Sequence, residues 1–242
     1  MFIFCGIGEH CVVILTFFLN LFNKLAFAYR VARLKLFASI SAPSQSPGLL
    51  AVIAKTTYLT IMRKVILDLA VSLDGYIEGP NGEIDWCILD DDMEFDKFIE
   101  SVDTIFYGRV SYDAWGNYQP ENDANDSVKA IWKAIHSKNK IVFTRQIRND
   151  NNVTYINSDI TQSVEQIKAK DGKDIWLYGG AKLIETFVDR KLIDIYRLSV
   201  HPVVLGNGKP LFENLKQRLN FELLSVKKFR SGVVQLIYKN EK

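Results

Sequence analysis

The sequence has little cysteine and no cluster of metal-binding residues. Its 242 residues include three cysteines (Cys5, Cys11 and Cys87) and three scattered histidines. No two cysteines have the spacing of a zinc site, and two of the three lie in the first 61 residues. Neither a disulfide framework nor a metal centre is therefore predicted.

The chain also lacks a strong excess of charge of either sign. The first 61 residues carry five basic residues and one acidic residue, a net of +4, which leaves −2 for the rest of a chain whose total is +2. A mildly acidic body has no basic surface for nucleic acid, so a nucleic-acid partner is not expected. An anionic ligand would have to be bound by local groups rather than by the overall field.

The usual nucleotide-binding fingerprints are missing. There is neither a P-loop nor a glycine-rich dinucleotide motif between a strand and a helix. The run GNGKP at 206–210 is followed by no helix and contains Pro210, so we interpret it as a turn.

The N-terminal 61 residues differ in composition from the rest. Residues 11–29 are apolar but are interrupted by two asparagines and a lysine, and a linker with many turn-forming residues follows over 39–61. Residues 1–10 contain no lysine or arginine, which argues against a secretory signal. Three explanations compete: translation from a start upstream of Met62, a membrane anchor that keeps the body cytoplasmic, or a surface or interface helix. We expect a cytoplasmic domain over 62–242 and no membrane partner.

Strands and helices alternate after Met62. Strands are predicted at 63–72, 104–108, 139–144, 153–157, 173–179 and 193–206. Helices are predicted at 91–102, 110–118, 126–137, 159–169 and 180–190. The segment 221–240 is predicted to form a hairpin that turns at Ser231-Gly232. This order predicts an α/β fold: a mixed, mostly parallel sheet flanked by helices on both faces, with an antiparallel C-terminal hairpin.

A pair of glycines lies where one predicted strand meets a helix. Tyr178 ends the strand, Gly179 and Gly180 follow, and the helix continues from Ala181. A tight turn would explain the pair. Alternatively, a helix N-terminus at the carboxyl end of a strand offers backbone N–H groups to a phosphate, and glycine lets the phosphate approach.

A second junction has a similar character. Gly108 ends a predicted strand, and Arg109 and Ser111 enter the next helix. Arg109 offers a guanidinium group to a phosphate, or it pairs with a nearby carboxylate such as Asp103 or Asp113.

A third strand ends at Thr144-Arg145, where a hydroxyl and a guanidinium group would suit a 2′-phosphate. A solvated loop arginine is the alternative. Three such junctions in one domain favour an extended phosphate ligand such as a dinucleotide.

The first loop, 72–86, contains three glycines together with Tyr76, Ile77 and Trp86. Such a loop could be a mobile flap over a site or a plain surface loop. Several acidic residues follow it. Most are expected to be solvated charges at a helix start, and one could face the pocket as a proton donor.

Four separated motifs carry a resemblance to a known family. In order they are VSLDGYI with a later DW, GRVSYDAW, LYGGAKLIETF and IDIYRLSVHPVVLGNGKPLF. They resemble the dihydrofolate-reductase-like family and, more closely, the reductase domain of the bifunctional riboflavin-biosynthesis deaminase–reductase in a stand-alone form. The resemblance covers residues 62–242. The zinc-ligand pattern of the deaminase domain is missing from this chain.

The resemblance implies an NADPH-dependent reductase that forms a homodimer. It implies hydride transfer to a C=N or C=O of a small heterocyclic or ribosylamino-pyrimidine-like substrate. By position, it implies that the glycine pair belongs to the pyrophosphate loop and that Thr144 and Arg145 contact the 2′-phosphate. The full set of residues with implied cofactor-binding roles is Ser72, Gly108, Arg109, Ser111, Thr144, Arg145, Tyr178, Gly179, Gly180 and Ala181.

The resemblance leaves several candidates for the catalytic acid. The resemblance puts Ser72, Asp74 and Gly75 on the substrate and nicotinamide side of the pocket. It puts the substrate acid of dihydrofolate reductases near Asp92, Glu94 and Asp96, without distinguishing among these three. The candidates are thus Asp74, Glu94 and Asp96. Three alternatives stay open: a silent nucleotide-binding module of the same fold, dihydrofolate reductase itself, and a membrane-tethered interaction protein.

Overall fold

The computed structural model describes residues 62–146, 148–150 and 153–241. The segment 1–61, to which the three explanations for the N-terminus refer, lies outside the described residues. Within the described part, no helix combines the length and the apolar character needed to cross a membrane.

The described chain alternates strands and helices, as predicted. The strands are β1 (Val65–Ser72), β2 (Tyr76–Glu78), β3 (Val102–Gly108), β4 (Asn139–Phe143), β5 (Val153–Ile156), β6 (Asp174–Gly179), β7 (Ile195–His201), β8 (Lys209–Pro210), β9 (Phe221–Lys228) and β10 (Val234–Asn240). The helices are the 3₁₀ turn η1 (Asp91–Met93), α3 (Phe95–Ser101), α4 (Arg109–Trp115), α5 (Asp126–His136), α6 (Ile160–Lys168) and α7 (Ala181–Asp189).

Eight strands form one mixed sheet in the order β5-β4-β3-β6-β1-β7-β10-β9. The pairs from β5 to β7 are parallel, and β10 pairs antiparallel with both β7 and β9. The C-terminal hairpin turns where predicted: Phe229 N donates to Val233 O at 2.9 Å, and Gly232 takes a φ of 91° that favours glycine. The predicted fold class is confirmed.

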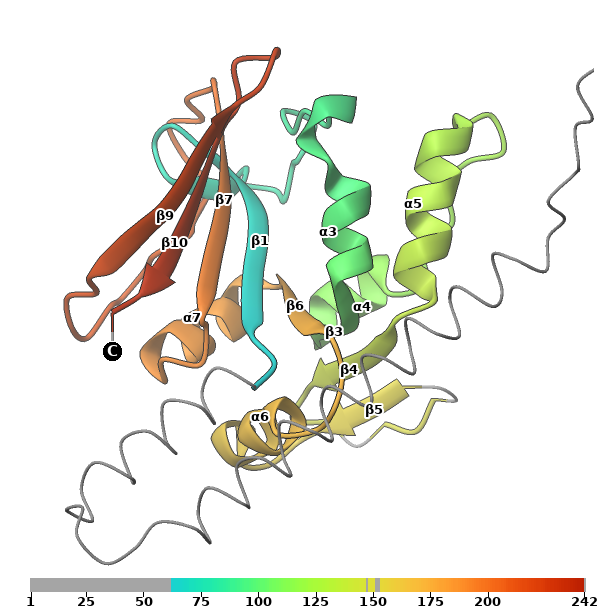
Figure 1. Ribbon diagram of the computed structural model, residues 1–242, viewed down its shortest axis with the longest axis vertical. Helices are drawn as coiled ribbons and strands as arrows, with labels where there is room; N and C mark the ends of the chain where they lie inside the picture. The colour runs from blue at the N-terminus through green and yellow to red at the C-terminus, as the bar shows by residue number, and fades with distance from the viewer. Residues whose placement is uncertain (1–61, 147, 151–152, 242) are drawn as a thin grey trace, which may run out of the picture. The chain divides into compact units, whose positions relative to one another are not determined.

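Helices cover both faces of the sheet (Figure 1). Each face has its own hydrophobic core. On one face, α6 and α7 bury Val164, Leu183 and Phe187 against β-strand residues such as Phe106. On the other face, α3, α4 and α5 pack their apolar residues against Trp176 and its neighbours. Burial of these two apolar layers is the main stabilising contribution to the fold.

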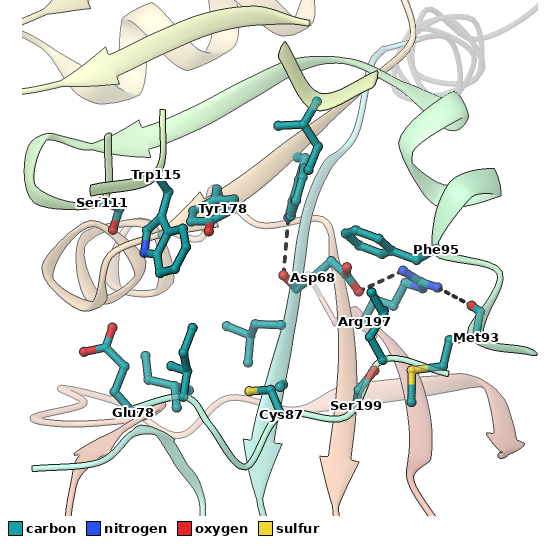
Figure 2. Close-up of a pocket in the computed structure, with 18 of the residues that line it drawn as sticks. Asp68, Glu78, Cys87, Met93, Phe95, Ser111, Trp115, Tyr178, Arg197 and Ser199 are labelled. Carbon is teal, nitrogen blue, oxygen red and sulfur yellow. Dashed lines mark hydrogen bonds and ion pairs between the residues drawn. The ribbon is translucent and has the colours of Figure 1, made fainter. Parts of the chain in front are cut away.

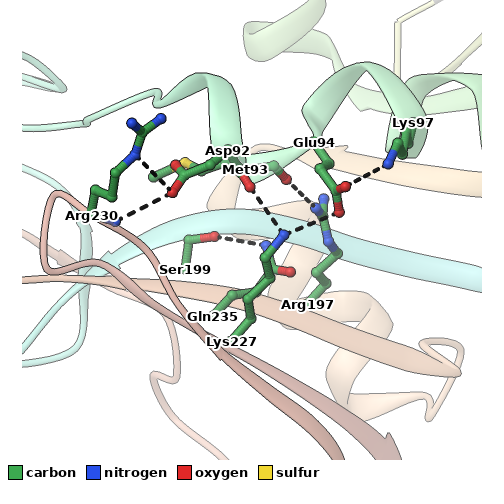
Figure 3. Close-up of polar contacts among 9 residues, drawn as sticks. All are labelled: Asp92, Met93, Glu94, Lys97, Arg197, Ser199, Lys227, Arg230 and Gln235. Atoms are coloured by element: carbon green, nitrogen blue, oxygen red, sulfur yellow. Dashed lines mark hydrogen bonds and ion pairs between the residues drawn. The ribbon is translucent and has the colours of Figure 1, made fainter.

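Two predicted elements are shorter than expected. The helix predicted at 91–102 breaks at Glu94, which takes a left-handed φ of 53° between η1 and α3. Met93 is buried against Phe229, and the Lys227 ammonium group bonds Asp92 O at 3.0 Å and the Glu94 carboxylate at 3.1 Å (Figure 3). These contacts with the hairpin hold the first turn away from the helix axis.

The strand predicted at 193–206 stops at His201. Pro202 has no N–H to donate to a ladder, and Val203 N bonds back to His201 O at 2.8 Å. The chain therefore turns away from the sheet at this point.

The first half of the glycine-rich loop forms a second, two-stranded sheet. β2 pairs antiparallel with β8. A Cβ atom at Gly208 would lie 2.2 Å from Glu78 O, so this close pairing needs glycine. This half of the loop is thus paired as a strand, and its movement as a flap over a site stays a prediction.

Candidate functional site

A cavity of about 380 Å³ lies over the carboxyl ends of the parallel strands. Its floor lies on the α3 and α5 face of the sheet and is formed by Asp68 and Ala70 of β1, Arg197, Ser199 and His201 of β7, and Gln235 of β10. β6 contributes Trp176 and Tyr178. Figure 2 shows Asp68, Arg197, Ser199 and Tyr178 around the cavity. The loop after β2 covers one side with Ile84, Cys87 and Leu89. The cavity lies where parallel α/β sheets bind their ligands.

Asp68 and Arg197 form an ion pair in the floor of the cavity. They are direct neighbours in the register of β1 and β7, and Arg197 Nη1 donates to Asp68 Oδ1 at 2.9 Å. The side chains are only 12% (Arg197) and 9% (Asp68) exposed. Among the described residues, no hydrogen bond to the second carboxylate oxygen, Oδ2, is found, which leaves that oxygen available to a ligand.

Burial raises the pKa of the Asp68 carboxyl group to about 6, and the Arg197 guanidinium group opposes part of that rise. The protonated form of Asp68 is therefore accessible near neutral pH. A carboxyl group that titrates near neutral pH can give a proton to a ligand and regain it from solvent.

The Arg197 guanidinium group is fixed by further contacts. It lies 4.6 Å from the centroid of the Phe98 ring, and Nη2 donates to Met93 O at 3.4 Å. The guanidinium group thus contacts the Asp68 carboxylate, the face of the Phe98 ring and the Met93 carbonyl oxygen. It orients Asp68 rather than standing free.

Three more polar side chains continue the floor toward the strand ends. Gln235 Nε2 donates to Ser199 Oγ at 3.3 Å. The two ring nitrogens of His201 lie 2.9 Å from Ser199 O and 3.2 Å from Ile88 O, which ties the loop after β2 to β7.

Aromatic side chains make up much of the wall. Trp115 and Trp132 stack with centroids 6.1 Å apart and planes 15° apart. Trp176 meets Tyr178 at 5.1 Å and the edge of Phe95 at 5.7 Å. Flat faces of this kind suit a planar ring ligand and keep bulk water out.

The glycine junctions meet at one end of the cavity. A Cβ atom at Gly108 would lie 3.1 Å from Gly180 N, and one at Gly180 would lie 2.8 Å from Ser111 Oγ. The Gly179–Gly180 peptide bond is cis, and Gly180 is the N-cap of the nine-residue helix α7. Two of the three junctions expected to bind phosphate are therefore in contact, and a side chain at Gly108 or Gly180 would require its neighbours to shift.

Comparison with known proteins identifies the family. The model of the RibD C-terminal domain matches residues 63–235. The chain belongs to this family. The uncharacterized protein YyaP of Bacillus subtilis strain 168 is 55% identical over 177 residues, which cover 73% of this chain and 94% of YyaP. A second uncharacterized B. subtilis protein, YwjB, is 35% identical over 185 residues, which cover 73% of this chain and 97% of YwjB.

Solved structures confirm the fold. A protein from Shewanella sp. PV-4, provisionally assigned to riboflavin biosynthesis, has a TM-score of 0.61 at 23% identity, over 74% of this chain and 99% of its own. Dihydrofolate reductase from Enterococcus faecalis, complexed with NADP(H), has a TM-score of 0.52 at 13% identity, and the match covers 74% of this chain and 97% of the reductase chain. The Thermotoga maritima deaminase and 5-amino-6-(5-phosphoribosylamino)uracil reductase has a TM-score of 0.52 at 17% identity, and the match covers 80% of this chain and 62% of the T. maritima chain.

In this RibD C-terminal domain, four of the predicted cofactor-binding residues line the cavity: Ser111, Tyr178, Gly179 and Gly180. Gly108 packs behind Gly180, and Ala181 is the first residue of α7.

Like Gly108 and Ala181, the remaining four predicted cofactor-binding residues are not among the described residues that line the cavity. Ser72 is buried and holds the next turn: its hydroxyl donates to Asp74 at 2.6 Å and accepts from Tyr76 N at 2.9 Å. Arg109 Nη1 donates to Asp113 Oδ2 at 2.8 Å, which is one of the pairings that the sequence left open.

Thr144 and Arg145 follow the end of β4, two strands away from β6. Thr144 Oγ1 accepts from Gln146 N at 3.0 Å, and Arg145 is exposed. Their contact with a 2′-phosphate stays a prediction.

None of the three predicted acids is among the described residues that line the cavity. Asp74 accepts from Leu205 N at 3.1 Å and Gly206 N at 2.7 Å, so it fastens a loop, and the Ser72 hydroxyl leads the groups that lower its pKa.

Glu94 lies on the surface with the ammonium groups of Lys97 and Lys227, which lower its pKa to about 2. Asp96 is exposed in the first turn of α3. The structure does not bring these two acids to the cavity.

The sequence analysis did not select Asp68 and Arg197 as site residues, although the composition of their strands pointed to them. Asp68 is the one charged residue in the strand VILDLAVS, and Arg197 is the one in IYRLSVH. A charge inside an otherwise apolar strand of a two-sided sheet needs a partner or a function. The pairing itself depends on strand register, which the sequence does not reveal.

Proposed function

We propose that this protein is a reductase that takes hydride from NADPH and delivers it to a C=N or C=O of a small heterocyclic or ribosylamino-pyrimidine-like substrate. One observation carries the proposal: a buried, protonatable carboxyl group and the glycine junction of α7 line the same aromatic cavity. Membership of a reductase-domain family supports the reaction class. We place the reaction in the cytoplasm.

The glycine junction fits the diphosphate of a dinucleotide. The first N–H groups of a helix have no partner within the helix, and α7 begins at the cavity. A Cβ atom at Gly108 would lie 3.1 Å from Gly180 N and one at Gly180 would lie 2.8 Å from Ser111 Oγ, so glycine lets these two junctions pack against each other beside the start of α7. We assign the diphosphate to Gly179, Gly180, Ala181 and the Ser111 hydroxyl.

NADPH, when bound, supplies a hydride to an electrophilic carbon. The protein's own residues do the rest. Asp68, with Oδ2 available, would give a proton to the heteroatom of the double bond being reduced, and Arg197 keeps its carboxyl group in position. The aromatic wall holds the ring flat and excludes water.

The silent nucleotide-binding alternative makes a different expectation. A module without turnover needs no acid beside the nucleotide pocket. The presence of Asp68 in the floor favours turnover instead.

The test is NADPH oxidation, followed at 340 nm, by the full chain with a panel of small heterocycles bearing C=N or C=O bonds. We expect oxidation with at least one compound and a loss of kcat of about 10²–10⁴-fold in Asp68→Asn. NADPH binding without oxidation of any compound would favour the silent module. Full activity in Asp68→Asn would remove the acid from the mechanism.

A further inference from the structure

The cavity is poor in positive charge. Among its described lining residues, Asp68 and Glu78 are acidic, and Arg197 is the one lysine or arginine. Arg197 is already engaged with Asp68, Met93 O and the Phe98 ring. Glu78 Oε2 lies 3.7 Å from Lys209 Nζ, so both acids of the lining already have a cation partner, and no uncommitted cation is found among the described lining residues.

A phosphate on the substrate would lack partners here. Phosphate sites combine guanidinium or ammonium groups with backbone N–H groups. The backbone N–H groups at Gly179 and Gly180 are assigned above to the diphosphate of the cofactor. The cation that pairs with Glu78, Lys209, is not among the described residues that line this cavity. Arg197 could bind a second phosphate only by giving up its ion pair with Asp68, whose carboxylate would then face a like charge.

The cavity offers good partners to a planar ring instead. Trp115, Trp132, Trp176 and Tyr178 present aromatic surface, and the free oxygen of Asp68 can accept a ring N–H. The Gln235 amide and the Ser199 hydroxyl add hydrogen-bonding groups on the same face of the sheet. These groups recognise a flat, nitrogen-containing ring by stacking and by its polar edge.

We propose that the substrate is an unphosphorylated, planar nitrogen heterocycle. This inference rests on the proposed function, because it assigns the glycine junction to the cofactor. It separates this chain from the T. maritima protein, whose name specifies a phosphoribosylamino-uracil.

The experiment uses three probes with one ring: 5,6-diaminouracil, 5-amino-6-ribosylaminouracil and its 5′-phosphate. Each is titrated into the full chain, with and without saturating NADPH, and binding is followed by tryptophan fluorescence. We expect at least one of the two unphosphorylated probes to bind at least tenfold more tightly than the phosphate. Equal or tighter binding of the phosphate, or binding of none of the three, would overturn the inference.

A charge reversal sharpens this test. Glu78→Lys puts a cation on the cavity wall, and we expect it to improve binding of the phosphorylated probe about tenfold while binding of 5,6-diaminouracil stays within twofold. Glu213→Lys makes the same change at an exposed position outside the cavity lining and should alter neither. If both variants act alike, the charge of the cavity does not select the substrate.

The two proposals fail in different ways. If NADPH does not bind but the unphosphorylated rings do, the cofactor assignment is wrong while the substrate class stands. If NADPH binds and is oxidised only with the phosphorylated probe, the reductase stands and the substrate class is wrong.

Discussion

At the scale of single residues, Asp68 decides the chemistry of the cavity. Its carboxyl group has a raised pKa of about 6 because it is buried, in spite of the cation beside it. Asp74 and Glu94 have lowered pKa values and hold loops and surface contacts. The sequence indicated an acid near the first loop, but only the register of β1 against β7 distinguishes a cavity acid from a structural one.

The pH profile of the reaction tests the role of Asp68. A proton donor with a raised pKa is active in its protonated form, so kcat should increase as pH falls from 8 to 6 and level off below 6. Above pH 7 the change should approach tenfold per pH unit. In Asp68→Asn this dependence should vanish together with most of the activity, whereas the affinity for NADPH stays within about threefold. An unchanged profile in the variant would assign the titration to another group.

Arg145 is a second residue whose role can be isolated. NADPH and NADH differ in the 2′-phosphate alone, so Arg145→Ala should weaken NADPH binding about 10–100-fold and leave NADH binding unaffected. Arg190→Ala, an exposed arginine at the end of α7, is the matched control. Equal losses for the two cofactors would remove Arg145 from the 2′-phosphate site.

At the scale of elements, periodicity and turn residues predicted most of the sheet and its helices. The departures come from contacts between distant segments. Hairpin residues hold η1 and Glu94 out of the helix that the sequence predicts, and Pro202 ends β7 early. The glycine junction was predictable because a strand, two glycines and a helix follow one another locally. Its contact with Gly108 and Ser111 was not, since it depends on β3 and β6 being neighbours.

The break at Glu94 gives a prediction about stability. Glycine adopts the left-handed conformation of residue 94 more readily than glutamate does. At residue 100, which is helical within α3, glycine instead destabilises the helix. Glu94→Gly should therefore unfold at a temperature about 2–4 °C above that of Glu100→Gly. Because Glu94 lies outside the cavity, Glu94→Gly should also keep its reductase activity. Loss of activity in a folded Glu94→Gly protein would restore Glu94 as a candidate acid.

At the scale of the whole molecule, the edge strand β9 is the surface that fits the homodimer implied by the family resemblance. Leu223, Leu224 and Val226 are 52%, 47% and 55% exposed on this strand. If two copies pair antiparallel with Leu224 opposite Ser225, Glu222 of each copy lies opposite Lys227 of the other. Apolar side chains and opposite charges would then match across a two-fold axis.

Light scattering tests this association. We expect a mass twice the 27.6 kDa of one chain, and a monomer for Val226→Lys. Val110→Lys changes a valine that is 67% exposed on α4 and should remain dimeric. A monomeric natural chain, or a dimer that survives Val226→Lys, would exclude β9 as the interface.

The central claim is that the aromatic cavity binds NADPH at the glycine junction. The most direct test is a titration of the full chain with NADPH and with NADH, followed by tryptophan fluorescence, since Trp115, Trp132 and Trp176 line the cavity. We predict saturable quenching with NADPH bound more tightly than NADH. In Gly180→Val, whose side chain would meet Ser111 Oγ, quenching by both should be lost. Absence of quenching by either nucleotide in the natural chain, or undiminished quenching in Gly180→Val, would contradict the claim.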